Sequence, residues 1–118
     1  MSEVEVTLVH FDPNGKPVEK TVRSRDRTAI DSLLAVINKR EQTTDCKCPE
    51  LGYIRFLAPR VDFRVGIMPG HSTGRIDLHE ADHTRWAVPH DEFIEALKRI
   101  GVSDFQAVLG QHGAPQRP

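Results

Sequence analysis

Apolar and polar residues alternate with a period of two in several segments of this chain, and this alternation constrains the fold more than any other feature. In the first segment Val4, Val6 and Leu8 alternate with Glu5 and Thr7. Successive side chains of a β-strand point to opposite faces of the sheet, so such a segment buries one face and exposes the other. The pattern therefore predicts antiparallel strands with one face on a core and one face toward water.

Two strands and a helix are expected in residues 1–40. The turn sequence DPNG at residues 12–15 separates the first alternating run from a second one at residues 18–23. Proline fixes one backbone angle and glycine tolerates positive φ, as a tight turn requires, so the two runs should form a β-hairpin. The apolar residues that follow have the i, i+3, i+4, i+7 spacing of a helix: Ile30, Leu33, Leu34 and Ile37. This ββα order resembles the start of the ubiquitin-type β-grasp fold, and the resemblance implies a fold and no function.

The remainder of the chain predicts further strands followed by helices. Residues 41–52 are polar and without periodicity, so we expect a loop there. Residues 53–58 and 60–68 alternate as two strands. Residues 89–100 should form a helix, because Pro89 suits a first helical position, acidic side chains fall in the first turn and basic side chains in the last. A short third helix should follow and end at Gly110.

These elements predict a single α+β domain. Their order is ββα-ββββ-α(α), where the last, short helix is in brackets. We expect a two-layer sandwich in which helices cover one face of a mostly antiparallel sheet of about five to six strands. The domain should span residues 1–110, and residues 111–118 should form a flexible tail. An exposed edge strand of such a sheet could also join two copies as a homodimer.

Residues 79–83 read His-Glu-Ala-Asp-His, the H-E-x-x-H pattern that zinc peptidases carry on a helix. That zinc site requires a helix, because two residues four apart then share one face. A period of two describes residues 75–88 better, since it places one apolar set on a single face: Ile76, Leu78, Thr84, Trp86 and Val88. We therefore expect a β-hairpin, in which the motif is an accident of the turn.

The predicted register of this hairpin has residues 80–82 as its loop. The expected cross-strand pairs are Leu78 with Thr84, Ile76 with Trp86, Asp77 with Arg85, and His79 with His83. Opposed imidazoles lie close enough to share a metal ion. A zinc-binding protein or metal-dependent hydrolase that uses His79 and His83, with Zn as its cofactor, is therefore the alternative function. Cys46 and Cys48 offer two further thiolates, but they lack the C-x₂-C spacing of a zinc site.

Arginine gathers on the sheet face that the helices are not expected to cover. If the alternating apolar residues face the helices, the opposite face displays Tyr53, Arg55, Arg64, Arg75, Asp77, His79, His83 and Arg85. Arginine and tyrosine are over-represented where proteins grip a partner, and the arginine fork fits carboxylates and phosphates. We therefore predict no catalytic residue and a binding set made of Tyr53, Arg55, Arg64, Arg75 and Arg85.

Charge and hydropathy argue against several classes of partner. The 16 basic and 17 acidic side chains give a formal net charge of −1, so no field of the whole molecule attracts nucleic acid. A single tyrosine offers little for base stacking. No apolar run is long enough to span a membrane, and the N-terminus lacks the features of a signal peptide. We therefore expect a cytoplasmic, non-enzymatic interaction module without a cofactor, which binds an acidic protein or a small anion.

Overall fold

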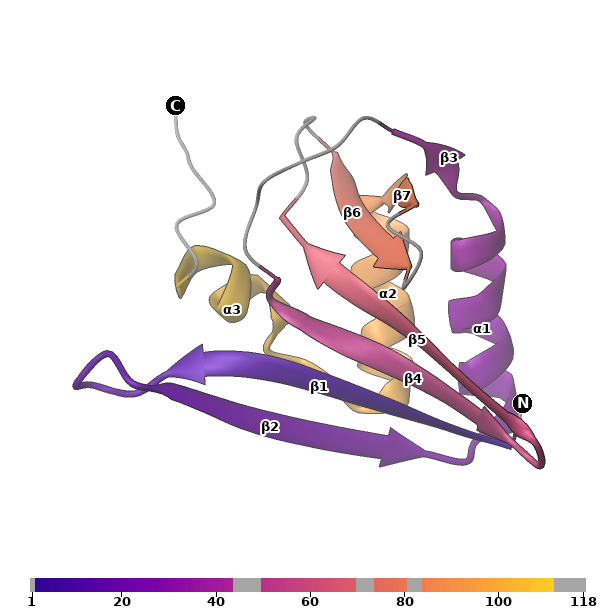
Figure 1. Ribbon diagram of the computed structural model, residues 1–118, viewed down its shortest axis with the longest axis horizontal. Helices are drawn as coiled ribbons and strands as arrows, with labels where there is room; N and C mark the ends of the chain where they lie inside the picture. The colour runs from indigo at the N-terminus through magenta and orange to yellow at the C-terminus, as the bar shows by residue number, and fades with distance from the viewer. Residues whose placement is uncertain (1, 44–49, 70–73, 81–83, 112–118) are drawn as a thin grey trace.

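Strands and helices occupy most of the part of the chain that the computed structural model describes, residues 2–43, 50–69, 74–80 and 84–111 (Figure 1). The strands are β1 (Glu3–Phe11), β2 (Pro17–Ser24), β3 (Glu41–Gln42), β4 (Gly52–Ala58), β5 (Val61–Met68), β6 (Arg75–Glu80) and β7 (Arg85–Pro89). The helices are α1 (Arg27–Asn38), α2 (His90–Ile100) and α3 (Phe105–Gln111). Within these residues no helix is long and apolar enough to cross a membrane.

The seven strands of the described residues form one antiparallel sheet in the order β2-β1-β4-β5-β6-β7-β3. This sheet and its helices confirm the predicted α+β fold. The sheet exceeds the predicted five to six strands because Glu41 and Gln42, assigned to a loop from the sequence, pair with Ala87 and Trp86 as β3. A strand of two residues is too short to show alternation. Strand β2 forms the long edge of the sheet, and a homodimer through an edge strand stays a prediction.

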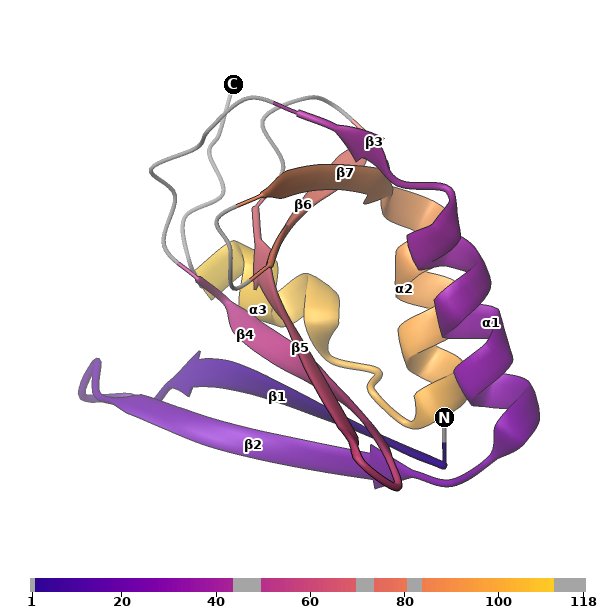
Figure 2. The same ribbon diagram turned by 45° about the vertical axis from the view of Figure 1, so that its right-hand side comes forward.

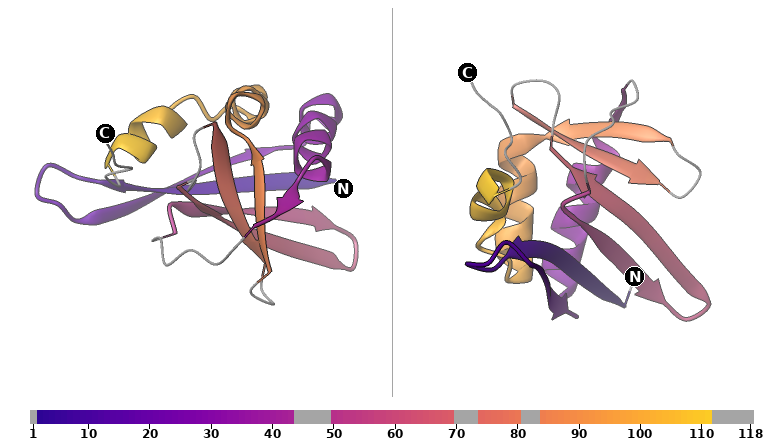
Figure 3. Two further views of the ribbon diagram at one scale, coloured as in Figure 1. Left: turned by 90° about the horizontal axis from the view of Figure 1, so that it is seen from above. Right: turned by 60° about the vertical axis from the view of Figure 1, so that its left-hand side comes forward.

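The helices lie on one side of a strongly curved sheet. In the right panel of Figure 3 the strands run around the helices from β2 through β4 and β5 to β6 and β7. Figure 2 shows α1 and α2 side by side. The alternating residues that face the helices are buried: Val4, Val6, Leu8, Ile54, Phe56, Val65, Ile67, Ile76, Leu78 and Val88. Phe93 of α2 and Phe105 of α3 meet edge to face, with ring centroids 5.6 Å apart.

Local sequence signals determine where two of the helices begin or end. The Asp26 carboxylate accepts hydrogen bonds from the backbone N–H groups of Thr28 at 3.0 Å and Ala29 at 3.3 Å, and so caps the start of α1. Gly101 ends α2 with a φ of 113°, a left-handed conformation that glycine adopts without strain. Its N–H donates to the carbonyl of Leu97, as at many helix C-termini.

Helix α3 runs one residue beyond its predicted end at Gly110. Its last residue, Gln111, binds the backbone of Phe11 in β1 twice. The Phe11 N–H donates to Oε1 of Gln111 at 3.0 Å, and Nε2 of Gln111 donates to the Phe11 carbonyl at 3.4 Å. The residue predicted to begin the tail is thus anchored to the sheet, and residues 112–118 lie outside the described part of the chain.

The predicted hairpin at residues 75–88 is present as β6 and β7, but its predicted register is wrong. The observed pairs are Ile76 with Val88, Asp77 with Ala87, Leu78 with Trp86, and His79 with Arg85. None of the predicted pairs Leu78–Thr84, Ile76–Trp86, Asp77–Arg85 and His79–His83 occurs in the described residues. The partner of each residue is shifted by two positions, and an even shift leaves every side chain on its predicted face. No glycine or proline occurs between Glu80 and Thr84 to mark the turn.

Gly52 leaves less room for a side chain than Gly66, the other glycine within a described strand, and its replacement tests the pairing of β1 with β4. A Cβ at this position would lie 2.0 Å from the carbonyl oxygen of Thr7. Because a backbone atom has to move, Gly52→Ala should destabilise the protein by about 3 kcal/mol, the upper range for overpacking. Denaturation with urea measures this change.

Gly110→Ala is the matched control, because nothing lies within 4 Å of a Cβ at Gly110 of α3. Alanine is the better helix former, so this variant should gain roughly 0.5–1 kcal/mol. Equal stability of the Gly52 variant and the unmodified protein would contradict the close approach of β1 and β4.

Candidate binding face of the sheet

The strand registers bring the five residues predicted to bind a partner onto one face. Tyr53 and Arg55 lie in β4, Arg64 in β5, Arg75 in β6 and Arg85 in β7, and each alternates with core residues of its strand. Arg55 lies directly opposite Arg64 in the pairing of β4 with β5. We call this surface, on the side of the strands away from the helices, the open face. A binding role for these residues stays a prediction.

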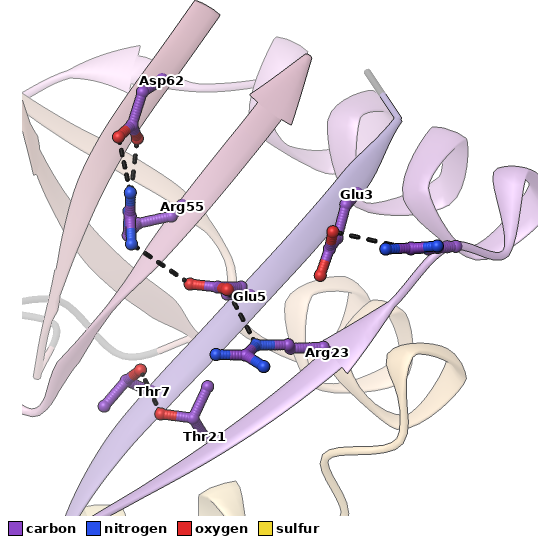
Figure 4. A network of polar contacts seen from close by, with 8 residues as sticks. Glu3, Glu5, Thr7, Thr21, Arg23, Arg55 and Asp62 are labelled. Carbon is purple, nitrogen blue, oxygen red and sulfur yellow. Dashed lines mark hydrogen bonds and ion pairs between the residues drawn. The ribbon is translucent and has the colours of Figure 1, made fainter. Parts of the chain in front are cut away.

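Two carboxylates of neighbouring strands hold Arg55 (Figure 4). Nε and Nη2 of Arg55 donate to the two carboxylate oxygens of Asp62, at 3.2 and 2.5 Å. Nη1 donates to Oε1 of Glu5 at 3.3 Å. The other oxygen of Glu5 lies 2.8 Å from Nε of Arg23 in β2. The Arg55 guanidinium therefore links β1, β4 and β5 through charged hydrogen bonds.

The contact between Arg55 and Asp62 changes the proton affinity of both groups. The hydrogen bonds from the guanidinium stabilise the charged carboxylate and hold the pKa of Asp62 below its ordinary value. The hydrogen bonds to Asp62, followed by its charge and that of Glu5, raise the pKa of Arg55. Arg55 is thus satisfied within the chain, which leaves it less available to an external anion.

Arg64, in contrast, is held by one carboxylate among the residues that the structure describes. Oε1 of Glu50 accepts from Nη2 of Arg64 at 3.1 Å, and Oε2 lies 4.0 Å from Nε2 of His79 in β6. A Cβ at Gly66 would lie 3.0 Å from Oε2, so the glycine leaves room for the carboxylate. The guanidinium carbon of Arg64 lies 4.1 Å from the ring centre of Tyr53, in cation–π contact. We call Tyr53, Arg64, Gly66 and His79, arranged around Glu50, the Glu50 cradle.

The other two arginines lie toward the β6 and β7 end of the open face. Nη1 of Arg75 lies 2.5 Å from Oε1 of Glu41 in β3. Nη1 of Arg85 lies 3.3 Å from Sδ of Met68. Met68 and Asp77 belong to the open face by register, yet each is only 2% exposed. At the β6 and β7 end of the open face, these two side chains are therefore shielded from solvent. Arg64, whose side chain is 56% exposed, is the most accessible of the predicted arginines.

The HEADH segment does not have the geometry of a zinc peptidase in its described residues. His79 and Glu80 are consecutive residues of strand β6 and therefore point to opposite faces of the sheet. His79 lies on the open face opposite Arg85. Glu80 lies on the core face, where its Oε2 accepts a hydrogen bond from Nε1 of Trp86 at 2.5 Å. In a zinc peptidase the glutamate has to act on a water bound to the same metal as the histidines, which this separation prevents.

A zinc site that uses His79 and His83 stays a prediction, because His83 lies outside the described residues, as do Cys46 and Cys48. Where the chain is described, no group of three or more His, Cys, Asp and Glu side chains could hold a metal ion. Arg85, opposite His79, adds a positive charge that opposes a cation on this part of the open face.

Sequence reasoning placed Asp77 on the open face but missed the carboxylates that hold the arginines there. Glu5 and Asp62 carried a signal, because each alternates with core residues and so shares a face with Arg55. Glu41 and Glu50 carried none, because both fall in the segment predicted to be a loop. Each of these four carboxylates forms an ion pair with an arginine, so positive charge on the open face is largely balanced by negative charge.

Comparison of this chain with protein-family models, curated proteins and solved structures finds no match. A binding role for the open face therefore has to follow from its own geometry. In that geometry Arg55 is held by two carboxylates from strands, whereas Arg64 is held by one carboxylate that precedes β4.

The lowered pKa of Asp62 provides a test of the Arg55 contact. Replacing Arg55 by Gln removes the guanidinium, so the pKa of Asp62 should rise toward its ordinary value. Because the pKa is depressed in the folded protein, the pair stabilises the fold above the unfolded pKa, and this contribution is lost as the pH falls through the folded pKa. A carboxyl carbon NMR titration measures the change.

Arg60→Gln is the control, because Arg60 is exposed in the turn between β4 and β5 and forms no ion pair with Asp62 in the described residues. It should leave the pKa of Asp62 nearly unchanged. An Asp62 pKa that moves equally in both variants would show that general positive charge, and not the Arg55 contact, is its cause.

Proposed function

We propose that this protein is a non-enzymatic, cytoplasmic binding module whose Glu50 cradle takes a carboxylate from an acidic segment of a partner protein. The observation that supports this function is the position of the Glu50 carboxylate between Arg64 and His79, above Gly66. The chain's own carboxylate occupies the place that a partner's carboxylate would take. The partner's acidic side chain would replace Glu50 and bind the same guanidinium.

The shape of the cradle favours a carboxylate ligand. Stacking on Tyr53 holds the Arg64 guanidinium in place, so little freedom is lost when its donors bind a ligand. A guanidinium presents paired N–H donors that match the two oxygens of a carboxylate. His79 adds a ring nitrogen from the neighbouring strand, and Gly66 keeps the floor free of a side chain.

Glu50 is held weakly enough to be displaced. It precedes β4 and belongs to no helix or strand, and one hydrogen bond of 3.1 Å joins it to Arg64. Its second oxygen, at 4.0 Å from His79, lies beyond hydrogen-bonding distance. Exposed ion pairs of this kind contribute roughly 0–1 kcal/mol. A partner with several acidic residues could therefore compete for Arg64.

The surroundings of the cradle favour an acidic protein segment over a nucleic acid. Glu5 and Asp62 lie on the same face, next to Arg55, and would repel a continuous line of phosphates. An acidic segment can instead alternate its carboxylates with neutral residues, and so reach Arg64 while it avoids the fixed carboxylates. The electrostatic pattern of the open face thus selects where along it a negative charge can bind.

Displacement of Glu50 predicts that its removal strengthens binding. Glu50→Ala should bind a hexaglutamate peptide about two- to fivefold more tightly than the unmodified protein, because the competing carboxylate is gone. Arg64→Gln should weaken binding, because the guanidinium is lost. Calorimetry measures both affinities, and the amide signals of the Glu50 cradle should shift in NMR spectra during the titration.

Glu92→Ala and Arg99→Gln provide charge-matched controls on the helix side and should change the affinity little. Titration with inorganic phosphate separates the two ligand classes: binding as tight as that of the peptide would favour a small anion instead of an acidic segment. No gain in affinity for Glu50→Ala would contradict displacement of Glu50.

A further inference from the structure

A cleft opens on the helix side of the sheet, away from the open face. It lies between the C-terminal half of α1 and the core face of β5, β6 and β7, and its volume is about 200 Å³. In Figure 2 this half of α1 lies across from β7 and β5. Because the cleft and the Glu50 cradle are on opposite sides of the sheet, what the cleft binds does not depend on the function proposed above.

The walls of the cleft are mainly apolar. Leu34 and Ile37 come from α1, and Val65 and Leu78 come from the sheet. Phe63 extends this wall along β5 and is 38% exposed, although it is a large hydrophobic side chain. A cavity of about 150 Å³ with similar walls binds benzene. The cleft therefore has room for one aromatic or short aliphatic group, which would cover Phe63.

One carboxylate stands in this apolar wall. Glu80 lies opposite Val65 in the pairing of β5 with β6, on the core face, and is half-buried. Nε1 of Trp86 donates to it at 2.5 Å. Among the described residues no lysine, arginine or histidine forms an ion pair with Glu80. A carboxylate beside apolar walls is unfavourable unless a positive charge compensates it.

The arginine that lines the cleft, Arg40, is engaged elsewhere. The guanidinium carbon of Arg40 lies 4.9 Å from the ring centre of Trp86, over its face, and Nη1 donates to the backbone carbonyl of Ile37 at 3.2 Å. Arg40 therefore covers one side of the Trp86 ring at the rim of the cleft. Glu80 remains the charged group on the cleft wall that lacks a cationic partner in the described residues.

We propose that this cleft binds a small organic amine with an apolar body. The apolar body fills the space beside Phe63 and Leu34, and the protonated amine donates to the free lone pairs of the Glu80 carboxylate. Trp86 holds that carboxylate in place through its indole N–H, so the acceptor is oriented before the ligand arrives. The ligand class follows from the apolar walls and the Glu80 carboxylate, since the cationic group of Arg40 at the rim is engaged with Trp86 and the Ile37 carbonyl.

Phenethylamine is a suitable probe, and Trp86 is a built-in reporter because it is the single tryptophan of the chain. Titration of the full-length protein should produce a saturable change in its fluorescence and in the NMR signal of its indole N–H. Phenylpropanoate has a similar apolar body but a carboxylate in place of the amine. It should bind at least about tenfold more weakly, as expected when an ion-paired hydrogen bond is replaced by repulsion.

Variants separate the charge of Glu80 from the shape of the cleft. Glu80→Gln keeps the size of the side chain and should weaken phenethylamine binding about tenfold. Arg40→Gln should leave the affinity unchanged or increase it, because a nearby positive charge is removed. Glu95→Gln, on the exposed side of α2, is the matched control and should have no effect. Glu50→Ala should also have none, since it lies on the other side of the sheet.

Three outcomes would overturn the proposal. Phenethylamine could leave both Trp86 signals unchanged, phenylpropanoate could bind as tightly as the amine, or Glu80→Gln could keep the affinity of the unmodified protein. The comparison of the two probes uses the unmodified chain, so it decides the matter even if a variant folds poorly.

Discussion

The antiparallel pairing of β1 with β4 is the constraint on which the rest of the structure depends. It joins the N-terminal hairpin to the strands of the second half, and its register sets Val4 opposite Phe56 and Val6 opposite Ile54 in the core. The same register sets Glu5 opposite Arg55 on the open face. A slip by one residue would move apolar side chains to water and Arg55 to the core, so the two faces are specified together.

Ion pairs on the open face differ in what they hold together. The carboxylates of Glu5 and Asp62 come from strands, so their contacts with Arg55 connect elements that the backbone ladder already pairs. Glu50 comes from the chain just before β4, and it reaches Arg64 of β5 with one hydrogen bond. Breaking the contacts of Arg55 would leave the carboxylates of Glu5 and Asp62 without this guanidinium as a partner. Breaking the contact between Glu50 and Arg64 leaves Glu50 free to be solvated, and for this reason the proposed binding site contains Arg64.

Alternation was sufficient to predict the face of a residue and insufficient to predict its partner. In the hairpin of β6 and β7, Leu78 faces Trp86 instead of Thr84, yet both registers bury the same residues, and no glycine or proline marks the turn. The positions of Glu41 and Glu50 depend on the path of the chain after α1, which leads to β3 beside β7 and then to β4 in the middle of the sheet. The cleft depends on how the sheet curves around α1. The positions of these two carboxylates and the shape of the cleft depend on segments far apart in the sequence, so local periodicity cannot predict them.

Strand β6 shows that one sequence motif supports different chemistry on a strand and on a helix. On a helix, His79 would share a metal with the residue four positions later, and Glu80 would activate a bound water. On a strand, His79 and Glu80 are separated by the sheet itself. His79 then contributes a ring nitrogen near the carboxylate of Glu50, while Glu80 contributes a carboxylate to an apolar cleft on the other side. His79 and Glu80 therefore do not act as one unit, because each belongs to a different surface with a different preference for charge.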